Sequence, residues 1–269
     1  SWTGFKYLYR DNIHVHVLDP SMGPVEGNTQ VTVRGVYFVN ATTNRCRFNT
    51  TIVHATYLSA THMLCVAPAP ITSLPAQYVT VEVTSNLQDY TTDGVKFMHY
   101  PSPVVHYVSP YMGPAADNGT KIGVYGAGFI NTPAFKCRFT LGGVVLYTVA
   151  DWRHATLAYC YSPYFGTSGA AVLELTNNDQ QYSNSGVEFL YYVDPTVTAV
   201  SPTLCLENTL TQITVIGTQF INSQYLRVRF GLNDIVNATY ISASAVSCIT
   251  PRIPASYRSV EVSNNALDY

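Results

Sequence analysis

The sequence contains the same pattern three times, and this internal repeat limits the possible folds more than any other feature. Each copy opens with a short segment containing a proline, at Pro20, Pro110 and Pro202, so the copies start 90 and 92 residues apart. The same order of motifs follows in each copy: an alternating apolar segment (31–35, 122–126, 213–217), an Arg-Phe pair (47–48, 138–139, 229–230) and a segment ending in proline (65–68, 160–163, 248–251). The chain therefore has three similar repeats, although 269 residues alone would suggest about two domains.

The motifs within each repeat predict β-strands. Apolar and polar residues alternate in short runs, which include a later run at residues 79–83, 171–175 and 259–262. Gly, Pro, Asn and Asp separate the runs, and no stretch keeps the 3.6-residue apolar period of a helix. Many short strands within about 90 residues are typical of an antiparallel β-sandwich.

The order of these motifs resembles the immunoglobulin-like IPT/TIG domain, and the resemblance covers nearly the whole chain. The second repeat carries the motifs best, at Ser109-Pro110, Gly113-Pro114, Gly126-Ala127-Gly128-Phe129, Cys137, Cys160-Tyr161-Ser162-Pro163 and Gly186-Val187-Glu188-Phe189. The third repeat departs most, because it lacks the Gly-Pro pair, has Val228 in place of a cysteine and carries an additional Cys205. The resemblance implies an all-β chain of three tandem immunoglobulin-like (IPT/TIG-type) β-sandwiches, which we expect to form a rod.

The closing strand distinguishes the third repeat from the first two. Repeats 1 and 2 end with Gly-Val-x-Phe at 94–97 and 186–189, four residues after Tyr90 and Tyr182. The third repeat reaches the matching Tyr269 without this motif, and Gly4 would follow Tyr269 at the same spacing. We therefore divide the chain into an N-terminal closing (donor) strand at 1–10, repeat 1 at 11–100, repeat 2 at 101–192 and an incomplete repeat 3 at 193–269.

A sandwich without its last strand exposes unpaired strand edges that can bind a strand of another chain. The N-terminal segment has aromatic residues at alternate positions and consists of Gly4, Phe5, Lys6, Tyr7, Leu8 and Tyr9. We expect this segment to complete the third repeat of the next copy by donor-strand complementation. Such a head-to-tail contact generates an open filament. Two alternatives remain: the chain is one period of a longer covalent array, or it is an unrelated truncation.

The six cysteines fall two to a repeat. Two pairs occupy equivalent positions and predict the disulfides Cys46–Cys65 and Cys137–Cys160. In the third repeat we expect a rerouted bridge between Cys205 and Cys248. Zinc binding is the competing interpretation, but no repeat has the Cys-x-x-Cys pair or nearby histidine that zinc needs.

Four Asn-x-Thr triplets match the N-glycosylation pattern, at Asn40, Asn49, Asn118 and Asn237. Together with the cysteines they predict a secreted, extracellular or cell-surface glycoprotein with covalent N-glycans. Charged residues make up only 11% of the sequence, so attached sugar would add solubility.

Composition and motifs argue against several other classes. The net charge of −2 is unlike the basic surface of a nucleic-acid-binding protein, and no apolar run is long enough to predict a membrane span in this chain. His14 and His16 share one face of a predicted strand, but two imidazoles without a third ligand are a weak metal signal. Asp151 and His154 have no recognisable nucleophile beside them. We predict no enzymatic activity, no metal and no cofactor.

The leading hypothesis is a structural subunit of an extracellular glycoprotein filament, with copies of itself as head-to-tail partners. The alternative is a ligand-binding or stalk ectodomain of a cell-surface receptor or adhesion protein, because the resemblance implies such roles too. The family also includes DNA-binding transcription factors, which the acidic charge balance disfavours. A carbohydrate-binding module is a further alternative, although no flat aromatic triad is identifiable.

Overall fold

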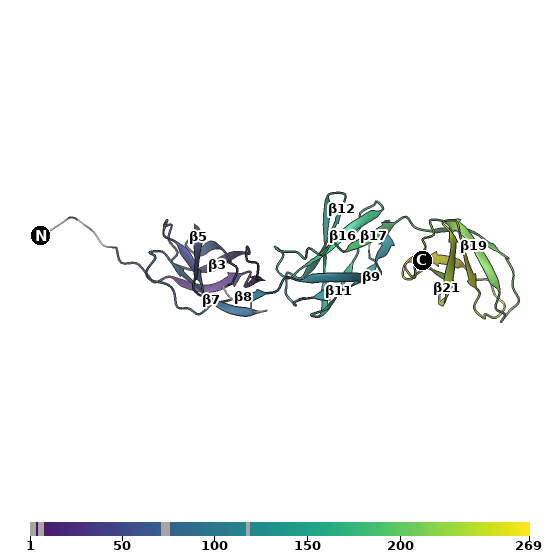
Figure 1. Ribbon diagram of the computed structural model, residues 1–269, viewed down its shortest axis with the longest axis horizontal. Coiled ribbons are helices and arrows are strands. Elements are labelled where there is room, and N and C mark those ends of the chain that lie inside the picture. Colours follow the sequence, from purple (N-terminus) through teal and green to yellow (C-terminus); the bar gives the residue numbers. More distant parts are fainter. Residues whose placement is uncertain (1–3, 5–7, 71–75, 117–118) are drawn as a thin grey trace. The chain divides into compact units, whose positions relative to one another are not determined.

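The computed structural model describes residues 4, 8–70, 76–116 and 119–269 (Figure 1). The described residues form β-strands and no helix, which confirms the all-β prediction. The chain divides into two compact units: residues 1–103 with 132–134 and 176–183, and residues 104–131 with 135–175 and 184–269. Each repeat has its own set of strands.

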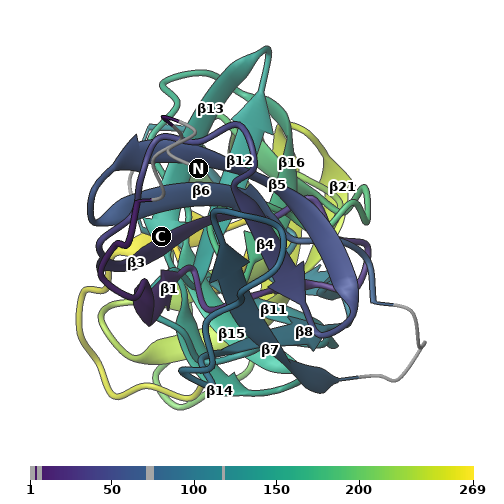
Figure 2. The same ribbon diagram turned by 90° about the vertical axis from the view of Figure 1, so that its left-hand side faces the viewer.

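The first repeat contains strands β1 to β8. Their order across the sheet is β1-β3-β6-β5-β4-β7-β8-β2, and several of these strands face the viewer in Figure 2. The alternation in β3 buries Val31 and Val33 and leaves the intervening positions at least partly exposed. The bounds are β1 His14–Asp19, β2 Met22–Pro24, β3 Gln30–Val36, β4 Arg45–Phe48, β5 Thr51–Ser59, β6 His62–Val66, β7 Gln77–Thr84 and β8 Lys96–Tyr100.

The second repeat contains strands β9 to β17 in two sheets. One sheet has the order β10-β17-β16-β12-β13 and the other β14-β15-β11-β9, as expected for a sandwich. The bounds are β9 Val104–Ser109, β10 Met112–Pro114, β11 Lys121–Ala127, β12 Lys136–Leu141, β13 Val144–Val149, β14 Asp151–His154, β15 Leu157–Tyr161, β16 Gly169–Thr176 and β17 Glu188–Tyr192.

The third repeat contains strands β18 to β23 in the order β18-β19-β22-β21-β20-β23. Among the described residues it has no strand equivalent to β2 and β8, or to β10 and β17. The bounds are β18 Thr196–Ser201, β19 Gln212–Thr218, β20 Arg227–Phe230, β21 Asp234–Ser242, β22 Ala245–Ile249 and β23 Val260–Ser263.

Each repeat encloses a separate apolar core. In the first two repeats a phenylalanine of the closing strand packs edge-on against the phenylalanine of the Arg-Phe motif. The ring centroids of Phe48 and Phe97 are 5.6 Å apart, and those of Phe139 and Phe189 are 6.4 Å apart. The third core contains Phe230 at the position of Phe48 and Phe139.

The Gly-x-x-Phe motif has a steric cause. A Cβ on Gly126 would lie 1.9 Å from the carbonyl oxygen of Val104 and 2.7 Å from the ring of Phe129. Gly35 and Gly217 meet the same two kinds of neighbour at almost the same distances. The first strand of each sandwich passes so close to this position that only glycine fits there. We call this residue the crossing glycine.

Candidate interaction site at the closing strand

The closing strand of a repeat pairs on both of its edges. In the first repeat β8 is antiparallel to β7, with Phe97 opposite Val79, and parallel to β2, with Met98 opposite Met22. In the second repeat β17 has the same two kinds of neighbour, β16 and β10. Removing a closing strand would therefore leave one edge unpaired on each of the two strands beside it.

Side chains at and before the closing strand also fasten the sandwich. Phe97 and Phe189 are fully buried. Just before the strand, Asp93 accepts the backbone N–H of Val15 at 2.7 Å, and Ser185 accepts that of Val105 at 2.9 Å. The closing segment therefore secures the first strand as well as the core.

Asp93 also contacts His14, whose Nδ1 lies 2.9 Å from a carboxylate oxygen of Asp93. Burial alone would raise the pKa of Asp93, but the hydrogen bonds from His14 and from the Val15 N–H outweigh this and lower it. His14 thus has a polar neighbour where the segment before the closing strand meets the first strand. It brings no group of three His, Cys, Asp or Glu side chains together among the described residues.

The third repeat lacks this arrangement. Strand β23 pairs with β20, and no further strand pairs with its other edge in the described part of the chain. The segment after β18, where β2 and β10 would have their counterpart, is not a strand, and Leu204 and Leu206 in it are 83% and 78% exposed. The third repeat therefore has an unpaired strand edge and, in the segment after β18, exposed apolar side chains.

The predicted donor segment is described only in part. Phe5, Lys6 and Tyr7 lie outside the described residues. Gly4 belongs to no strand, and Leu8 and Tyr9 are exposed and belong to none either.

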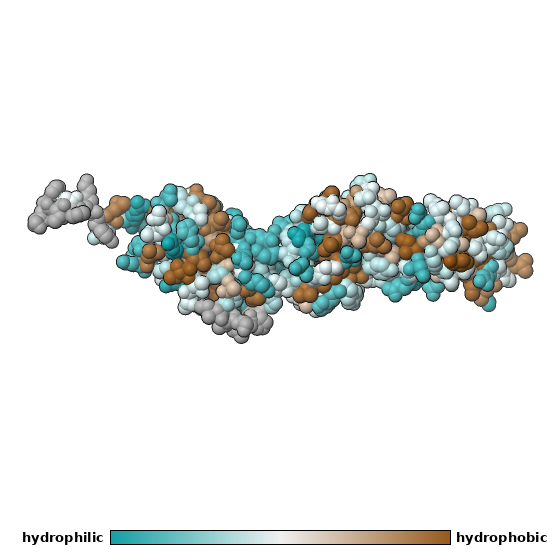
Figure 3. All heavy atoms as spheres, turned by 45° about the horizontal axis from the view of Figure 1, so that its top comes forward, coloured by the Kyte–Doolittle hydropathy of each residue, from teal (hydrophilic) through white to brown (hydrophobic). Residues whose placement is uncertain are grey.

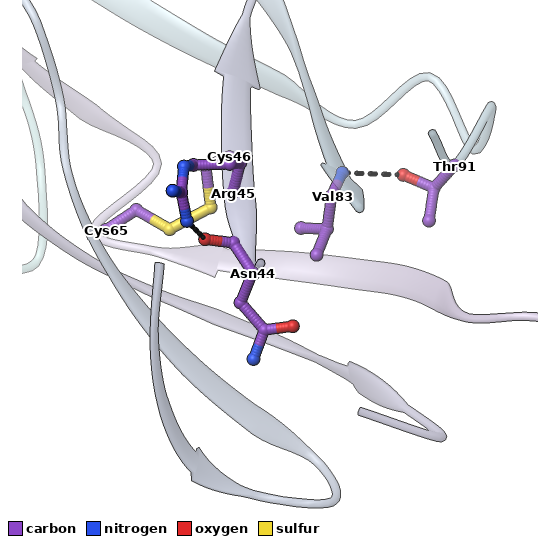
Figure 4. Close-up of a disulfide and its surroundings, with 6 residues drawn as sticks. All are labelled: Asn44, Arg45, Cys46, Cys65, Val83 and Thr91. Atoms are coloured by element: carbon purple, nitrogen blue, oxygen red, sulfur yellow. Dashed lines mark hydrogen bonds between the residues drawn. A yellow bond between two sulfur atoms is a disulfide. The ribbon is translucent and has the colours of Figure 1, made fainter. Parts of the chain in front are cut away.

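The structure contains the disulfides Cys46–Cys65 and Cys137–Cys160, both with 6.4 Å between the Cα atoms. Figure 4 shows the first of these bridges next to Asn44 and Arg45, where β4 begins. The two bridges agree with the predicted extracellular or cell-surface location, because such bonds persist in oxidising compartments.

The predicted Cys205–Cys248 bridge is wrong, since both cysteines are free. Cys248 lies opposite Ile213, just as Cys160 lies opposite Ile122, so it holds the core position of the bridged cysteines. The position that Cys46 and Cys137 hold in the other repeats is occupied here by Val228, so Cys248 has no cysteine opposite it in the core. Cys205 is instead exposed in the segment after β18. Burial raises the pKa of the Cys248 thiol to about 11.

Three predicted glycosylation residues, Asn40, Asn49 and Asn237, are exposed. Asn118 lies outside the described residues. Apolar residues also reach the surface, where Figure 3 shows them among more hydrophilic ones. The described residues include no helix with the length and apolar character needed to cross a membrane.

An ion pair that was not predicted from the sequence occurs in all three repeats. Arg138 Nε donates to Glu174 at 2.8 Å, and Arg229 Nε donates to Glu261 at 2.7 Å. Arg47 and Glu82 form the same pair in the first repeat. The signal was present in the Arg-Phe pair and in the glutamate of the later alternating strand.

The comparisons with known proteins match this architecture. The model of the IPT/TIG domain matches the chain three times, at residues 14–98, 103–191 and 195–269. Human Plexin-A3 is 29% identical over 254 residues, covering 88% of this chain and 13% of that protein. Rat Plexin-A3 is 29% identical over 259 residues with the same coverage, so the chain spans only a small part of these relatives.

Among solved structures, the full extracellular region of plexin A4 aligns with a TM-score of 0.47 and 18% identity, covering 91% of this chain and 21% of that one. The three family matches confirm the three predicted repeats. Since they cover most of the sequence, the chain belongs to the IPT/TIG domain family.

Proposed function

We propose that this chain is part of the stalk or ligand-binding ectodomain of a cell-surface receptor or adhesion protein, and that it is not catalytic. The similarity to Plexin-A3 carries this proposal, because it runs through 88% of the chain. The two disulfides and the separate core of each repeat suit a spacer that must keep its fold outside the cell. Exposed Asn40, Asn49 and Asn237 would carry sugar on such a spacer.

Fractionation of the source cells tests this function. An antibody against the chain should detect a protein larger than the chain's 29.6 kDa in the membrane fraction, and detergent should be needed to release it. A protein that leaves the membranes in detergent-free buffer and sediments as polymer would contradict the receptor proposal. Glycosidase treatment of the same sample should lower its intact mass, and no shift would contradict the glycan prediction.

A second candidate function is self-assembly by strand insertion, favoured by the unpaired edge of β23. The segment Gly4–Tyr9 has the glycine and the alternating aromatic residues of a closing strand. Inserted beside β23, its Tyr7 would take the place that Phe97 and Phe189 have in the other cores. Its Phe5 would take the place of Val95 and Val187, which pack against those cores. Backbone pairing along the strand would supply the affinity.

Electron microscopy of the purified full chain tests strand insertion. Filaments should form and should disappear in the Phe5→Asp variant, whereas Lys6→Gln on the opposite face should still assemble. Filaments that persist in Phe5→Asp would overturn this candidate. A denaturing gel of native material separates it from covalent continuation, since separate subunits run near 29.6 kDa plus glycans.

A further inference from the structure

A compact polar turn follows β7 in the first repeat. Thr84 Oγ1 accepts the backbone N–H groups of Asn86 and Leu87 at 3.3 and 3.1 Å. Asn86 Oδ1 accepts the N–H groups of Gln88 and Asp89 at 3.0 and 2.9 Å, while Asn86 Nδ2 donates to Asp89 Oδ2 at 2.8 Å. These bonds fix the side chains of the turn, which we call the first amide turn (residues 84–89).

The other two repeats contain the same turn. Asn178 Nδ2 donates to Gln181 at 2.7 Å after β16, and Asn265 Nδ2 donates to Asp268 at 2.6 Å after β23. Residues 176–181 and 263–268 are the second and third amide turns. The sequence does not predict these turns, because their Asn, Asp and Gln residues look like those of any polar loop.

The second amide turn has a partner within the first compact unit. Gln181 Oε1 accepts the hydroxyl of Thr29 at 3.0 Å, and Gln181 Nε2 donates to the carbonyl of Asn28 at 3.2 Å. Gln180 accepts the N–H of Gln30 at 2.8 Å and donates to its carbonyl at 2.9 Å. Thr29 is completely buried. This turn therefore holds the threonine that directly precedes β3.

The third amide turn makes an equivalent contact within the second compact unit. Asp268 Oδ2 accepts the hydroxyl of Thr120 at 2.7 Å, and Asn265 Nδ2 donates to the carbonyl of Met112 at 3.2 Å. Thr120 directly precedes β11, as Thr29 precedes β3, and it is 3% exposed. Two amide turns thus bind a threonine at the same structural position.

One amide turn and one such threonine remain without this contact. In the first amide turn Gln88 and Asp89 are exposed. Thr211 directly precedes β19, it is partly exposed, and its hydroxyl makes no hydrogen bond within the described part of the chain. The first amide turn has both recognition groups seen elsewhere: Gln88 corresponds to Gln180, and Asp89 to Asp268.

We propose that the first amide turn binds the start of β19, at Thr211 and Gln212, in a second copy of this chain. The hydroxyl of Thr211 donates to Asp89, and the side chain of Gln88 bonds the backbone of Gln212, which follows Thr211 as Gln30 follows Thr29. The turn needs little reorganisation on binding, because its own hydrogen bonds already hold Asn86 and Asp89 in place. This contact goes beyond the proposed functions, since its surface is separate from the β23 edge and requires no membrane context.

Sedimentation velocity of the full chain over a concentration series tests this contact. The chain should associate, and Asp89→Leu and Thr211→Val should each raise the dissociation constant about tenfold or more, as expected when a hydrogen bond to a charged group is lost. Asp89→Gln and Thr211→Ser are the matched controls and should keep the association. All four variants replace an exposed or partly exposed side chain outside the cores, so circular dichroism should show an unchanged fold.

The Phe5→Asp background separates this contact from strand insertion, and the same four variants are measured in it. If Asp89→Leu and Thr211→Val also raise the dissociation constant in this background, the amide-turn contact is supported whether or not the original chain forms filaments. A chain that stays monomeric over the whole series overturns the proposal. Association that is identical in Asp89→Leu, Thr211→Val and the original chain also overturns it.

Discussion

The second and third repeats have the same framework but differ in how they are closed. Both have the crossing glycine, at Gly126 and Gly217, and both have an Arg–Glu pair between equivalent strands. Only the second has a disulfide and a paired closing strand in the described part of the chain. The framework of this sandwich therefore forms without bridge or closing strand, and these two features add stability to it.

The closing strand should have the largest effect on stability. Phe189→Ala would remove the buried ring that packs on Phe139 and make the second repeat more like the third. We expect a loss of about 3 to 5 kcal/mol in its free energy of unfolding, because the cavity adds to the lost burial. Hydrogen exchange of β16 and β17 in the full chain measures this effect.

Leu190→Ala is the control for this prediction, since Leu190 lies on the same strand and is 36% exposed. It should change exchange in β16 and β17 only slightly. Equal protection in Phe189→Ala and the original chain would show that the ring does not stabilise the repeat.

The disulfide should have the next largest effect. Val228→Cys would place a thiol at the position of Cys137, with Cys248 already at the position of Cys160. A bridge closing a loop of about 20 residues is expected to add about 3 kcal/mol to the third repeat. Urea unfolding with and without reductant measures the gain, and intact mass should show the loss of two hydrogens.

The control for the bridge is Val228→Cys combined with Cys248→Ser, which cannot form it. If Val228→Cys alone unfolds at the same urea concentration in oxidant and in reductant, the two positions are not equivalent. That result would also contradict our explanation of why Cys205 and Cys248 stay free.

The strands and glycines of the sandwich framework could be predicted from the sequence, whereas the polar contacts and the third bridge could not. Gly126 and Phe129 could be recognised because the steric clash they avoid has only one solution, so the motif recurs in every repeat. The bridge of Cys205 was predicted wrongly because spacing along the chain does not tell whether a side chain points into the core. The amide turns escaped detection because Asn86 and Asp89 act through geometry that their residue types do not reveal.

The closing strands of the first and second repeats differ at one core position, which should make the first more sensitive to acid. His99 is 1% exposed and corresponds to Tyr191, whose hydroxyl donates to the carbonyl of Pro163 at 2.9 Å. Burial lowers the pKa of His99, and a hydrogen bond with the Pro24 backbone opposes this only in part. The folded first repeat therefore favours neutral His99.

Because the folded-state pKa lies below that of the unfolded chain, near 6.5, stability should fall as the pH drops through that value. The slope cannot exceed about 1.4 kcal/mol per pH unit for one group. Hydrogen exchange of β7 and β8 between pH 7 and pH 5 measures it, and Tyr191→His should transfer the sensitivity to β16 and β17. An unchanged pH profile in His99→Tyr would contradict the assignment.

The Arg–Glu pairs should show the smallest difference between the repeats. The side chain of Glu174 is 12% exposed beside β17, whereas that of Glu261 is 40% exposed on β23, whose outer edge is open. An exposed pair contributes about 0 to 1 kcal/mol and is weakened by salt. Glu261→Gln should therefore destabilise its repeat by less than Glu174→Gln does, and added salt should reduce the smaller effect more. Urea unfolding at low and high salt measures both, and equal losses would mean that the open outer edge of β23 does not expose this pair. Supplying a closing strand to the third repeat should then raise the effect of Glu261→Gln to that of Glu174→Gln, because water would be excluded from the pair in the same way.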